Sequence, residues 1–541
     1  MNEKPTMAPS LWERSTFGRL CRWLFSWRGM RRVLIVLAWT GTIVGLWYGE
    51  ENWRGRRAWN QYREALEARG ESLAFASYIP KPVPDDQNFA ATPLLKSFVA
   101  NSDEQTSLGQ ITNDLYTRAT DHVTYTNAVK DNGHRHFTDL VAWQMASAAL
   151  QNGAMKREQK FETGQADLDA RASAAPAVLE GMKLDQAAFA ELRAASTREY
   201  SRYPLKYDLE NPWGIIVPHL ARIKGVCQRL YLVTCAELAA GQTDQALADE
   251  KLMLALADSI KSDPFLISFL VRDSCLQIAI QPVWEGLAEH RWTDVQLQEL
   301  QSRFLSYDFM ADLQQCMKGE RACGIQSVDL IRRKGLAFAR ELSANPDEGQ
   351  TEAAAFDLLR HFMPAGWYDR ERLNYCRLFD VQNRCARNPA ARIISPSKVA
   401  ADTEEFEGQI YNWHPGSFFA GLLRHRLIAG LLLPSLNKIP YKVAIAQTAT
   451  AQSALACALE RYRLAHGQFP DQLDALLPQY ISRLPNDIIT GQPYKYRRTD
   501  DGQFILYSVG WNEKDDGGVP GKTLFDQTQG DWVWSYPSQL E

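Results

Sequence analysis

Hydrophobic positions along the chain follow three different patterns, and each pattern predicts a different kind of element. Residues 33–49, VLIVLAWTGTIVGLWYG, are an unbroken uncharged run whose length is near the lower limit for a helix that spans a bilayer. Across residues 221–260 the apolar positions recur at the spacing of amphipathic helices. Near the C-terminus, the runs PYKYRR (493–498) and FILYSV (504–509) favour strands. We therefore expect a mainly α protein with an N-terminal transmembrane helix, a body of helical hairpins and a small C-terminal α+β module.

The body contains the clearest helical signal. Residues 221–260 form two amphipathic stretches separated by a turn at Gly241, and Thr243 or Asp244 is expected to cap the second helix. A second hairpin is expected over about 265–304. The pattern of small residues around Gly241 resembles the turn between the helices of a tetratricopeptide repeat, although the spacing is not a clean 34 residues. The sequence therefore predicts paired antiparallel helices and leaves open a TPR-like array or an irregular helical domain.

Two further helices are expected before the C-terminal runs. The segment SFFAGLLRHRLIAGLLLPSL (417–436) carries Arg424, His425 and Arg426 in its middle. Because charges are costly in hydrocarbon, this segment is predicted to be a buried helix and not a second membrane span. A long helix is predicted over 439–466.

The charges that flank the uncharged run predict its orientation. Trp27, Trp47 and Tyr48 lie where interfacial aromatic residues belong. A cleaved signal peptide would need small residues after the apolar run, and the chain has WYGEENWRG there. We therefore expect a single-pass anchor in a bacterial inner membrane, in contact with the lipid bilayer through residues 33–49, with the N-terminus cytoplasmic and the C-terminal body periplasmic. The basic residues on the cytoplasmic side are Arg14, Arg19, Arg22, Arg28, Arg31 and Arg32.

The expected organisation has five parts. They are a cytoplasmic basic segment (1–32), the transmembrane anchor (33–49), a stalk and linker (50–89), an α-helical body (90–416), and a long helix with a small antiparallel β module (417–541).

Composition narrows the classes of partner. The chain has 541 residues, of which 45% are hydrophobic and 23% charged, as in folded globular proteins. Its net charge of −4 offers no basic excess to neutralise a phosphate backbone, so no nucleic acid partner is expected.

The nine cysteines do not form a CxxC pair, so zinc-ribbon and thioredoxin-like proteins have no support. Cys376 and Cys385 bracket a short polar segment and could close a small loop. Cys316 and Cys323 lie about two turns apart if they share a helix, too far for a disulfide. Most of the cysteines are expected to be small buried hydrophobic residues.

The C-terminal motifs carry a resemblance to a known family. A helix ending in ALERYRLAHGQFPDQLDAL (458–476) is followed by LPQYISRLPNDIITGQPYKYRR (477–498) and GQFILYSVGWNEKDDGG (502–518). This order resembles the C-terminal domain of type II secretion major pseudopilins over about 95 residues. Gly467 is expected to end the helix, where a positive φ is needed, and Pro470 prevents its resumption. The aromatic residues expected to pack against this helix are Tyr494, Tyr496 and Tyr507.

In that family, the acidic loop after the second strand binds calcium through carboxylates, a serine and backbone carbonyls. The matching positions are Ser508, Asp515, Asp516 and Asp531. Hard oxygen ligands on a Gly-rich loop suit calcium, whereas a plain solvated turn explains the same Asp-Asp-Gly-Gly sequence without metal. Both interpretations stay open, and calcium is the one cofactor that the resemblance implies.

Candidate catalytic residues are sparse. His122, His134 and His136, with Asp121 and Asp139, could bind a transition metal, or they could lie in a solvated loop. The sequence has no GxSxG, HExxH, P-loop or GxGxxG motif, and no catalytic residue is assigned.

The whole layout resembles membrane-anchored bacterial envelope proteins, a resemblance that implies a location and no activity. The expected function is a membrane-anchored scaffold that binds another envelope protein, related to secretion or pseudopilus-like assemblies. The alternative is an anchored periplasmic hydrolase or metal-dependent enzyme.

Overall fold

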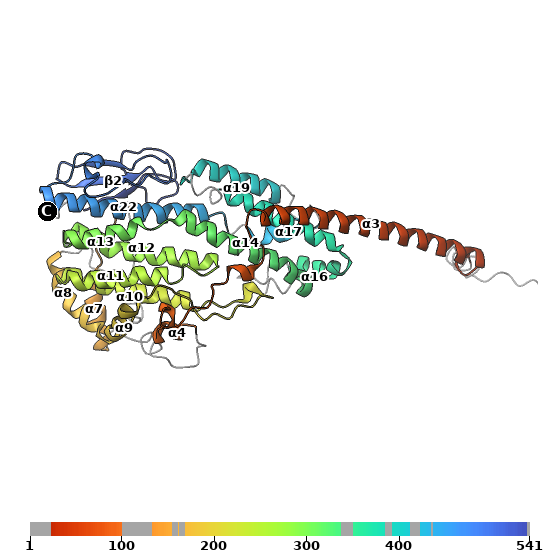
Figure 1. Cartoon of the computed structure of the whole chain (residues 1–541), viewed down its shortest axis with the longest axis horizontal. Coiled ribbons are helices and arrows are strands. Elements are labelled where there is room, and N and C mark those ends of the chain that lie inside the picture. Colours follow the sequence, from red (N-terminus) through yellow and green to blue (C-terminus); the bar gives the residue numbers. More distant parts are fainter. Residues whose placement is uncertain are drawn as a thin grey trace, which may run out of the picture.

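The protein is a mainly α-helical molecule with a small antiparallel sheet near the C-terminus and a long apolar helix near the N-terminus (Figure 1). This coarse architecture confirms the expectation from the sequence. The computed structural model describes residues 23–99, 133–153, 161, 168–336, 350–384, 392–411, 422, 424–433 and 436–537.

The helices and strands of the described residues follow one another in a simple order. The helices are α3 (Trp27–Glu67), α4 (Pro93–Ser97), α7 (Leu140–Gln151), α8 (Leu168–Gly181), α9 (Gln186–Ala195), α10 (His219–Ala239), α11 (Thr243–Asp258), α12 (Leu266–Ala288), α13 (Asp294–Leu305), α14 (Phe309–Lys334), α16 (Gln350–Leu359), α17 (Ala365–Gln382), α19 (Pro396–Tyr411), α21 (Leu427–Leu432) and α22 (Ile439–His466). Short 3-10 turns are η1 (Phe75–Tyr78), η2 (Phe89–Ala91), η4 (Lys183–Asp185), η5 (Pro212–Gly214), η6 (Arg360–Phe362) and η9 (Leu473–Leu476). The strands are β1 (Lys495–Arg498), β2 (Phe504–Ser508) and β3 (Trp532–Trp534).

Two consecutive helical hairpins, α10–α11 and α12–α13, form the centre of the body, as the periodicity predicts. Gly241 has a φ of 75° and makes the first turn, where a residue without a Cβ avoids strain. The expected cap of α11 is wrong: Gln242 is the N-cap and makes no side-chain capping bond. Asp244 instead accepts a hydrogen bond of 2.8 Å from Gln296 Nε2, which ties α11 to α13. Tertiary contact has taken the carboxylate away from its local use.

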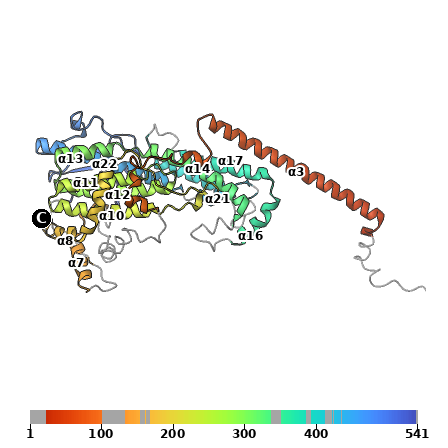
Figure 2. The same ribbon diagram turned by 60° about the horizontal axis from the view of Figure 1, so that its bottom comes forward.

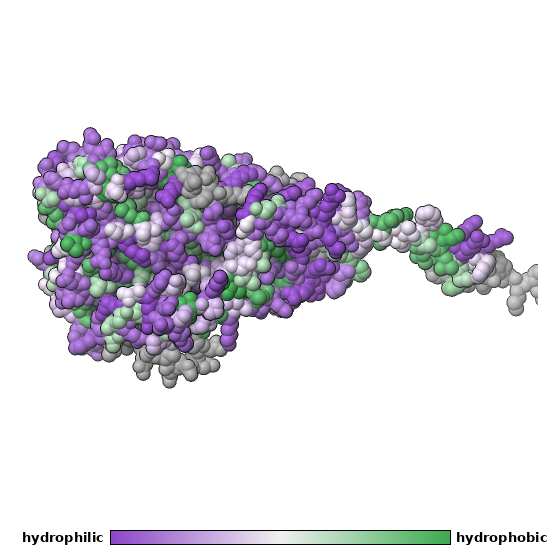
Figure 3. All heavy atoms as spheres, in the orientation of Figure 1, coloured by the Kyte–Doolittle hydropathy of each residue, from purple (hydrophilic) through white to green (hydrophobic). Residues whose placement is uncertain are grey.

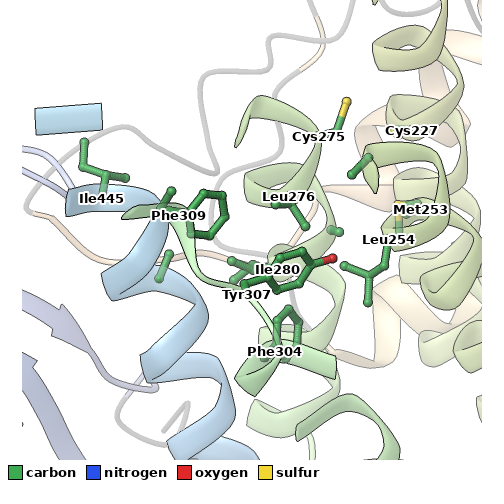
Figure 4. Packing of buried hydrophobic residues seen from close by; sticks show 14 of the residues in the cluster. Cys227, Met253, Leu254, Cys275, Leu276, Ile280, Phe304, Tyr307, Phe309 and Ile445 are labelled. Carbon is green, nitrogen blue, oxygen red and sulfur yellow. The ribbon is translucent and has the colours of Figure 1, made fainter. Parts of the chain in front are cut away.

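The helix α22 has the bounds that the sequence predicts, and Gly467 ends it with a φ of 78°. It packs against α12 and α13, and most of its face consists of buried alanines, which allow close approach of the helices. Figure 4 shows this core between Ile445 of α22, Phe309 and Ile280 of α12, with Leu254 of α11 beyond them. The last long helix of the chain is therefore part of the central body.

The segment 417–436 is not the single buried helix that its hydropathy predicts. His425 has a φ of 56° and separates residue 424 from α21, which has only six residues. Ile428 and Leu433 are buried, so the apolar part lies inside the protein as expected.

The sheet has the order β1-β2-β3, and both pairs are antiparallel. The β1–β2 hairpin was expected, whereas β3 was not, because a three-residue strand has too few positions to show alternation. Gln452 of α22 donates a hydrogen bond of 2.7 Å to the Trp532 carbonyl, which fixes β3 on the helix. Tyr494 is buried as expected, but Tyr507 lies under the loop at Gly518 and not against α22. The reason is that Tyr507 alternates with Leu506, which occupies the core side.

Candidate functional site

The helix α3 divides into two halves with different surroundings. Its N-terminal half contains the uncharged run 33–49, whose side chains are largely exposed. Its C-terminal half lies along α17 on the body. Figure 3 shows hydrophobic atoms on the projecting part of the helix, whereas the body surface in this view is mainly hydrophilic. A second helix, α12, is also long and apolar enough to cross a membrane, but most of it is buried in the core.

The two halves meet at a close crossing of α3 and α17. A Cβ placed on Gly55 would lie 2.1 Å from the Gly366 carbonyl oxygen, and a Cβ on Gly366 would lie 2.2 Å from the Glu51 carbonyl oxygen. Both distances are far below contact distance, and the opposing atoms belong to the backbone. The crossing therefore needs glycine on both sides. We call Glu51, Asn52, Gly55, Gly366 and Trp367 the anchor joint.

Hydrogen bonds fix the register of the anchor joint. The backbone N–H of Gly366 donates to Asn52 Oδ1 at 2.9 Å, and Trp367 Nε1 donates to Glu51 Oε2 at 3.0 Å. Arg370 forms an ion pair with Glu51 at 3.2 Å. Sequence reasoning missed these residues, and the only local signal is a glycine within the polar half of a predicted helix.

A groove of about 320 Å³ lies between the helical body and the C-terminal module. Met310 and Ile488 contribute apolar surface, and Asp308 pairs with Arg392 at 2.7 Å on its wall. Arg483 adds a second cation. A wider hollow of about 950 Å³ lies beside the anchor joint, between α3, α14 and α17. Neither hollow is lined by histidine.

The acidic loop gathers some of the expected calcium ligands but not all of them. Asp531 accepts backbone hydrogen bonds from Asp516 (3.2 Å) and Gly518 (2.6 Å). Asp515 accepts one from the Tyr507 hydroxyl at 3.0 Å and pairs with Lys495 at 3.5 Å. Hydrogen bonding from the Gly517 N–H lowers the pKa of Asp515, whereas burial raises that of Asp531. The loop carboxylates thus take donors from the chain itself.

Ser508 lies away from these carboxylates in its bonding. Its hydroxyl donates to Asp487 Oδ1 at 2.9 Å, and both side chains are buried. Asp487 also accepts from the Ile489 N–H at 3.0 Å, and burial raises its pKa. Asp487, from the Leu-Pro-Asn-Asp motif, is therefore the structural node that joins the turn to β2. Across the part of the chain that the structure describes, no three His, Cys, Asp or Glu side chains are grouped to hold a metal ion. Calcium binding by the loop stays a prediction.

The histidine segment serves packing where it is described. His134 Nδ1 lies 3.2 Å from Ser535 Oγ of the C-terminal tail, and the His136 carbonyl accepts from Gln281 at 2.7 Å. Asp139 caps α7 by accepting from the Ala142 N–H. Asp121 and His122 lie outside the described residues, as does Cys385, the expected partner of the buried Cys376.

A buried ionic network lies behind that segment. Arg171 pairs with Glu285 at 2.5 Å and with Glu289, and all three side chains are almost completely buried. Thr138 donates to Glu285 at 2.6 Å. The network joins α8, α12 and the segment before α7, so its residues stabilise the body.

A second group of buried acids has few partners. Glu237 of α10 and Asp249 and Glu250 of α11 are buried, and both carboxyl oxygens of Glu250 have no hydrogen-bond partner among the described residues. Burial, with the nearby Asp249, raises the pKa of Glu237 to about 8. These carboxyls are stable when protonated.

One buried histidine has a carboxylate partner. His219 Nε2 lies 2.9 Å from Asp263 Oδ2, and Ser268 donates to the same oxygen at 3.0 Å. A nucleophilic serine would have to donate to the histidine, so this arrangement lacks the order of a Ser-His-Asp triad. All three residues are buried, and the group holds α10 against α12.

No family model, curated protein or solved structure matches the chain. The function is therefore inferred from the geometry of α3, the groove and the C-terminal motifs.

Proposed function

We propose that the protein is a single-pass protein of a bacterial inner membrane whose body lies in the periplasm and acts as a scaffold for another envelope protein. The observation that carries this proposal is the division of α3. Its uncharged run is exposed over a length of about 25 Å at 1.5 Å per residue, while its polar half is locked to the body. Exposed apolar surface of this kind is stable in a bilayer and not in water.

The orientation follows from charge. Arginines dominate the residues before the uncharged run, and acids balance the basic residues after it. Basic segments stay on the cytoplasmic side of the membrane, which places the body in the periplasm. A cleaved signal peptide would end near the run itself, yet the helix continues without interruption through residues that contact α17. An intact anchor is therefore the better interpretation.

The scaffold role is supported by the groove between the body and the C-terminal module. Its lining combines apolar side chains with Arg392 and Arg483, a mixture typical of protein-binding surfaces. The module next to it has the helix, turn and β-hairpin that resemble a pseudopilin, so the partner we favour belongs to a secretion or pseudopilus-like assembly. The paired helices of the body, α10 to α13, would present this module in the way that TPR-like hairpins present a binding surface.

The enzymatic alternative lacks a comparable observation. It would need a polar cavity where histidines and acids converge, and the groove offers Asp308 with two arginines instead. The buried His219 and Asp263 have no opening to either hollow described above.

Two experiments test the two parts of the proposal. Protease added to spheroplasts should digest the body while residues before the run stay protected. A protected body, or a mature protein that begins near residue 50, would contradict the anchored topology.

Photo-crosslinking in living cells tests the groove. A crosslinking amino acid at Leu305 or Ile393, which line the groove, should give a discrete adduct with one envelope protein. The same amino acid at Ile216, an exposed apolar position outside the groove, is the matched control. Equal patterns at the three positions would refute the assignment of the groove.

A further inference from the structure

One end of the body surrounds the point where α3 leaves it. In Figures 1 and 2, α16 and the start of α17 lie at the end from which the helix projects, whereas α13 lies near the opposite end. The Tyr48 hydroxyl donates to the Phe362 carbonyl, and the Trp47 ring packs edge-on against Trp367 at 5.8 Å between centroids. Residues at the very end of the uncharged run therefore contact η6 and α17.

This end carries two large apolar side chains that the body does not cover. Leu358 is 69% exposed and Phe362 is 68% exposed. Their exposure does not come from a loose segment, because Phe356 of the same helix is buried in a second core cluster with Ile331 and Tyr368. The fold holds Leu358 and Phe362 outward.

The height of Phe362 along α3 is fixed by its contact with Tyr48. Tyr48 is the second-last residue of the uncharged run, so Phe362 lies within a few ångströms of the level where the hydrocarbon must end. Aromatic residues are favoured at this level of a membrane, as Trp47 and Tyr48 already illustrate.

Cations surround the same end. The last turn of α14 carries Arg332, Arg333 and Lys334, and Arg360 donates hydrogen bonds of 2.9 Å to the carbonyls of the first two. Glu210 lies 3.5 Å from Arg333 and offsets part of this charge. Basic residues beside a membrane surface attract anionic phospholipid, each by about 1 kcal/mol.

We propose that this end of the body, formed by Leu358, Phe362 and the basic end of α14, is a second membrane contact that inserts into the outer leaflet of the bilayer. The inference rests on the proposed anchoring of α3 and adds a surface that the sequence did not indicate. Leu358 and Phe362 would enter the interfacial region, with the cations at the level of the phosphates, as in interfacial amphipathic segments. Two points of attachment would hold the body at a fixed tilt, where one helix alone would let it swing.

Lipid-depth quenching of the full chain in nanodiscs tests this contact. Phe362→Cys is labelled with an environment-sensitive fluorophore, after Cys21 and Cys385 are changed to serine; the other seven cysteines are buried. The substitution keeps the bond to Tyr48, because that bond uses the Phe362 carbonyl. Nanodiscs containing spin-labelled phospholipid should quench the label several-fold more strongly than a label at Val295→Cys. Val295, on α13, is 73% exposed and is the matched control.

Each result decides between the possibilities. Equal, weak quenching at positions 362 and 295 in incorporated protein overturns the membrane contact and leaves the anchor intact. A blue-shifted emission at position 362 without lipid quenching shows that a second copy of the chain covers it, which also overturns the proposal. Failure of the protein to enter nanodiscs would instead refute the anchoring by α3.

Discussion

The anchor joint yields the sharpest prediction, made by Gly366→Ala. The added methyl group would lie 2.2 Å from the Glu51 carbonyl oxygen and 2.7 Å from the Asn52 Cα. Because both are backbone atoms of a helix, neither can rotate away. The helices α3 and α17 must therefore separate by about 1 Å to restore normal contact near 3.5 to 4 Å.

The cost of that separation has two sources. Overpacking of a tight contact costs about 1–3 kcal/mol. The bonds from Gly366 N–H to Asn52 and from Trp367 to the charged Glu51 depend on the same approach, and they contribute about 1 and about 1.5–3 kcal/mol. We expect a loss of about 3–6 kcal/mol from the docking of α3, and 3 kcal/mol is already about a 150-fold increase in opening.

Hydrogen exchange measured by mass spectrometry on the detergent-solubilised full chain would detect this opening. Amides in the docked half of α3 and in the first turns of α17 should exchange about 100-fold faster in Gly366→Ala, at 1.4 kcal/mol per factor of ten. Gly49→Ala is the matched control, because a Cβ at Gly49 meets nothing within 4 Å. Unchanged protection in Gly366→Ala, or an equal loss in Gly49→Ala, would refute the role of the joint.

Three further predictions concern stability. Burial raises the pKa of Glu237 to about 8 from an ordinary 4.5, so the stability that its proton contributes is complete below about pH 4.5 and is lost as the pH rises toward 8. Glu237→Gln should therefore melt like the wild type at pH 5 and be more stable at pH 8 by up to about 4 kcal/mol; an equal difference at both pH values would contradict this. Arg171→Met leaves two buried carboxylates without their cation and should cost about 3–5 kcal/mol in denaturant unfolding, whereas Arg384→Met, on the surface, should cost less than about 1 kcal/mol. Because the loop carboxylates already take donors from the chain, the full protein should melt at the same temperature with chelator and with millimolar calcium. A calcium-dependent rise that Asp515→Ala/Asp516→Ala abolishes would instead establish the calcium site.

The sequence by itself determined the elements whose signals are local. The hairpin over residues 221–260 follows from 3.6-residue periodicity and from Gly241, and the bounds of α22 follow from the same periodicity and from Gly467. The β1–β2 hairpin follows from alternation. The uncharged run 33–49 identifies itself by length and composition. These features depend on neighbours within one or two turns of chain, so periodicity and turn chemistry suffice.

Only the tertiary structure decided which distant segments meet. Gly55 and Gly366 look like ordinary glycines until α3 and α17 cross, because the need for a missing Cβ arises from the opposing backbone. Ser508, expected to face the acidic loop, donates to Asp487 because the strand register places it there. Phe362 looks like one more core residue in sequence, and its exposure at the height of Tyr48 exists only once the long helix has docked. Contacts between residues far apart in the chain depend on how whole elements pack, and no local pattern encodes that packing.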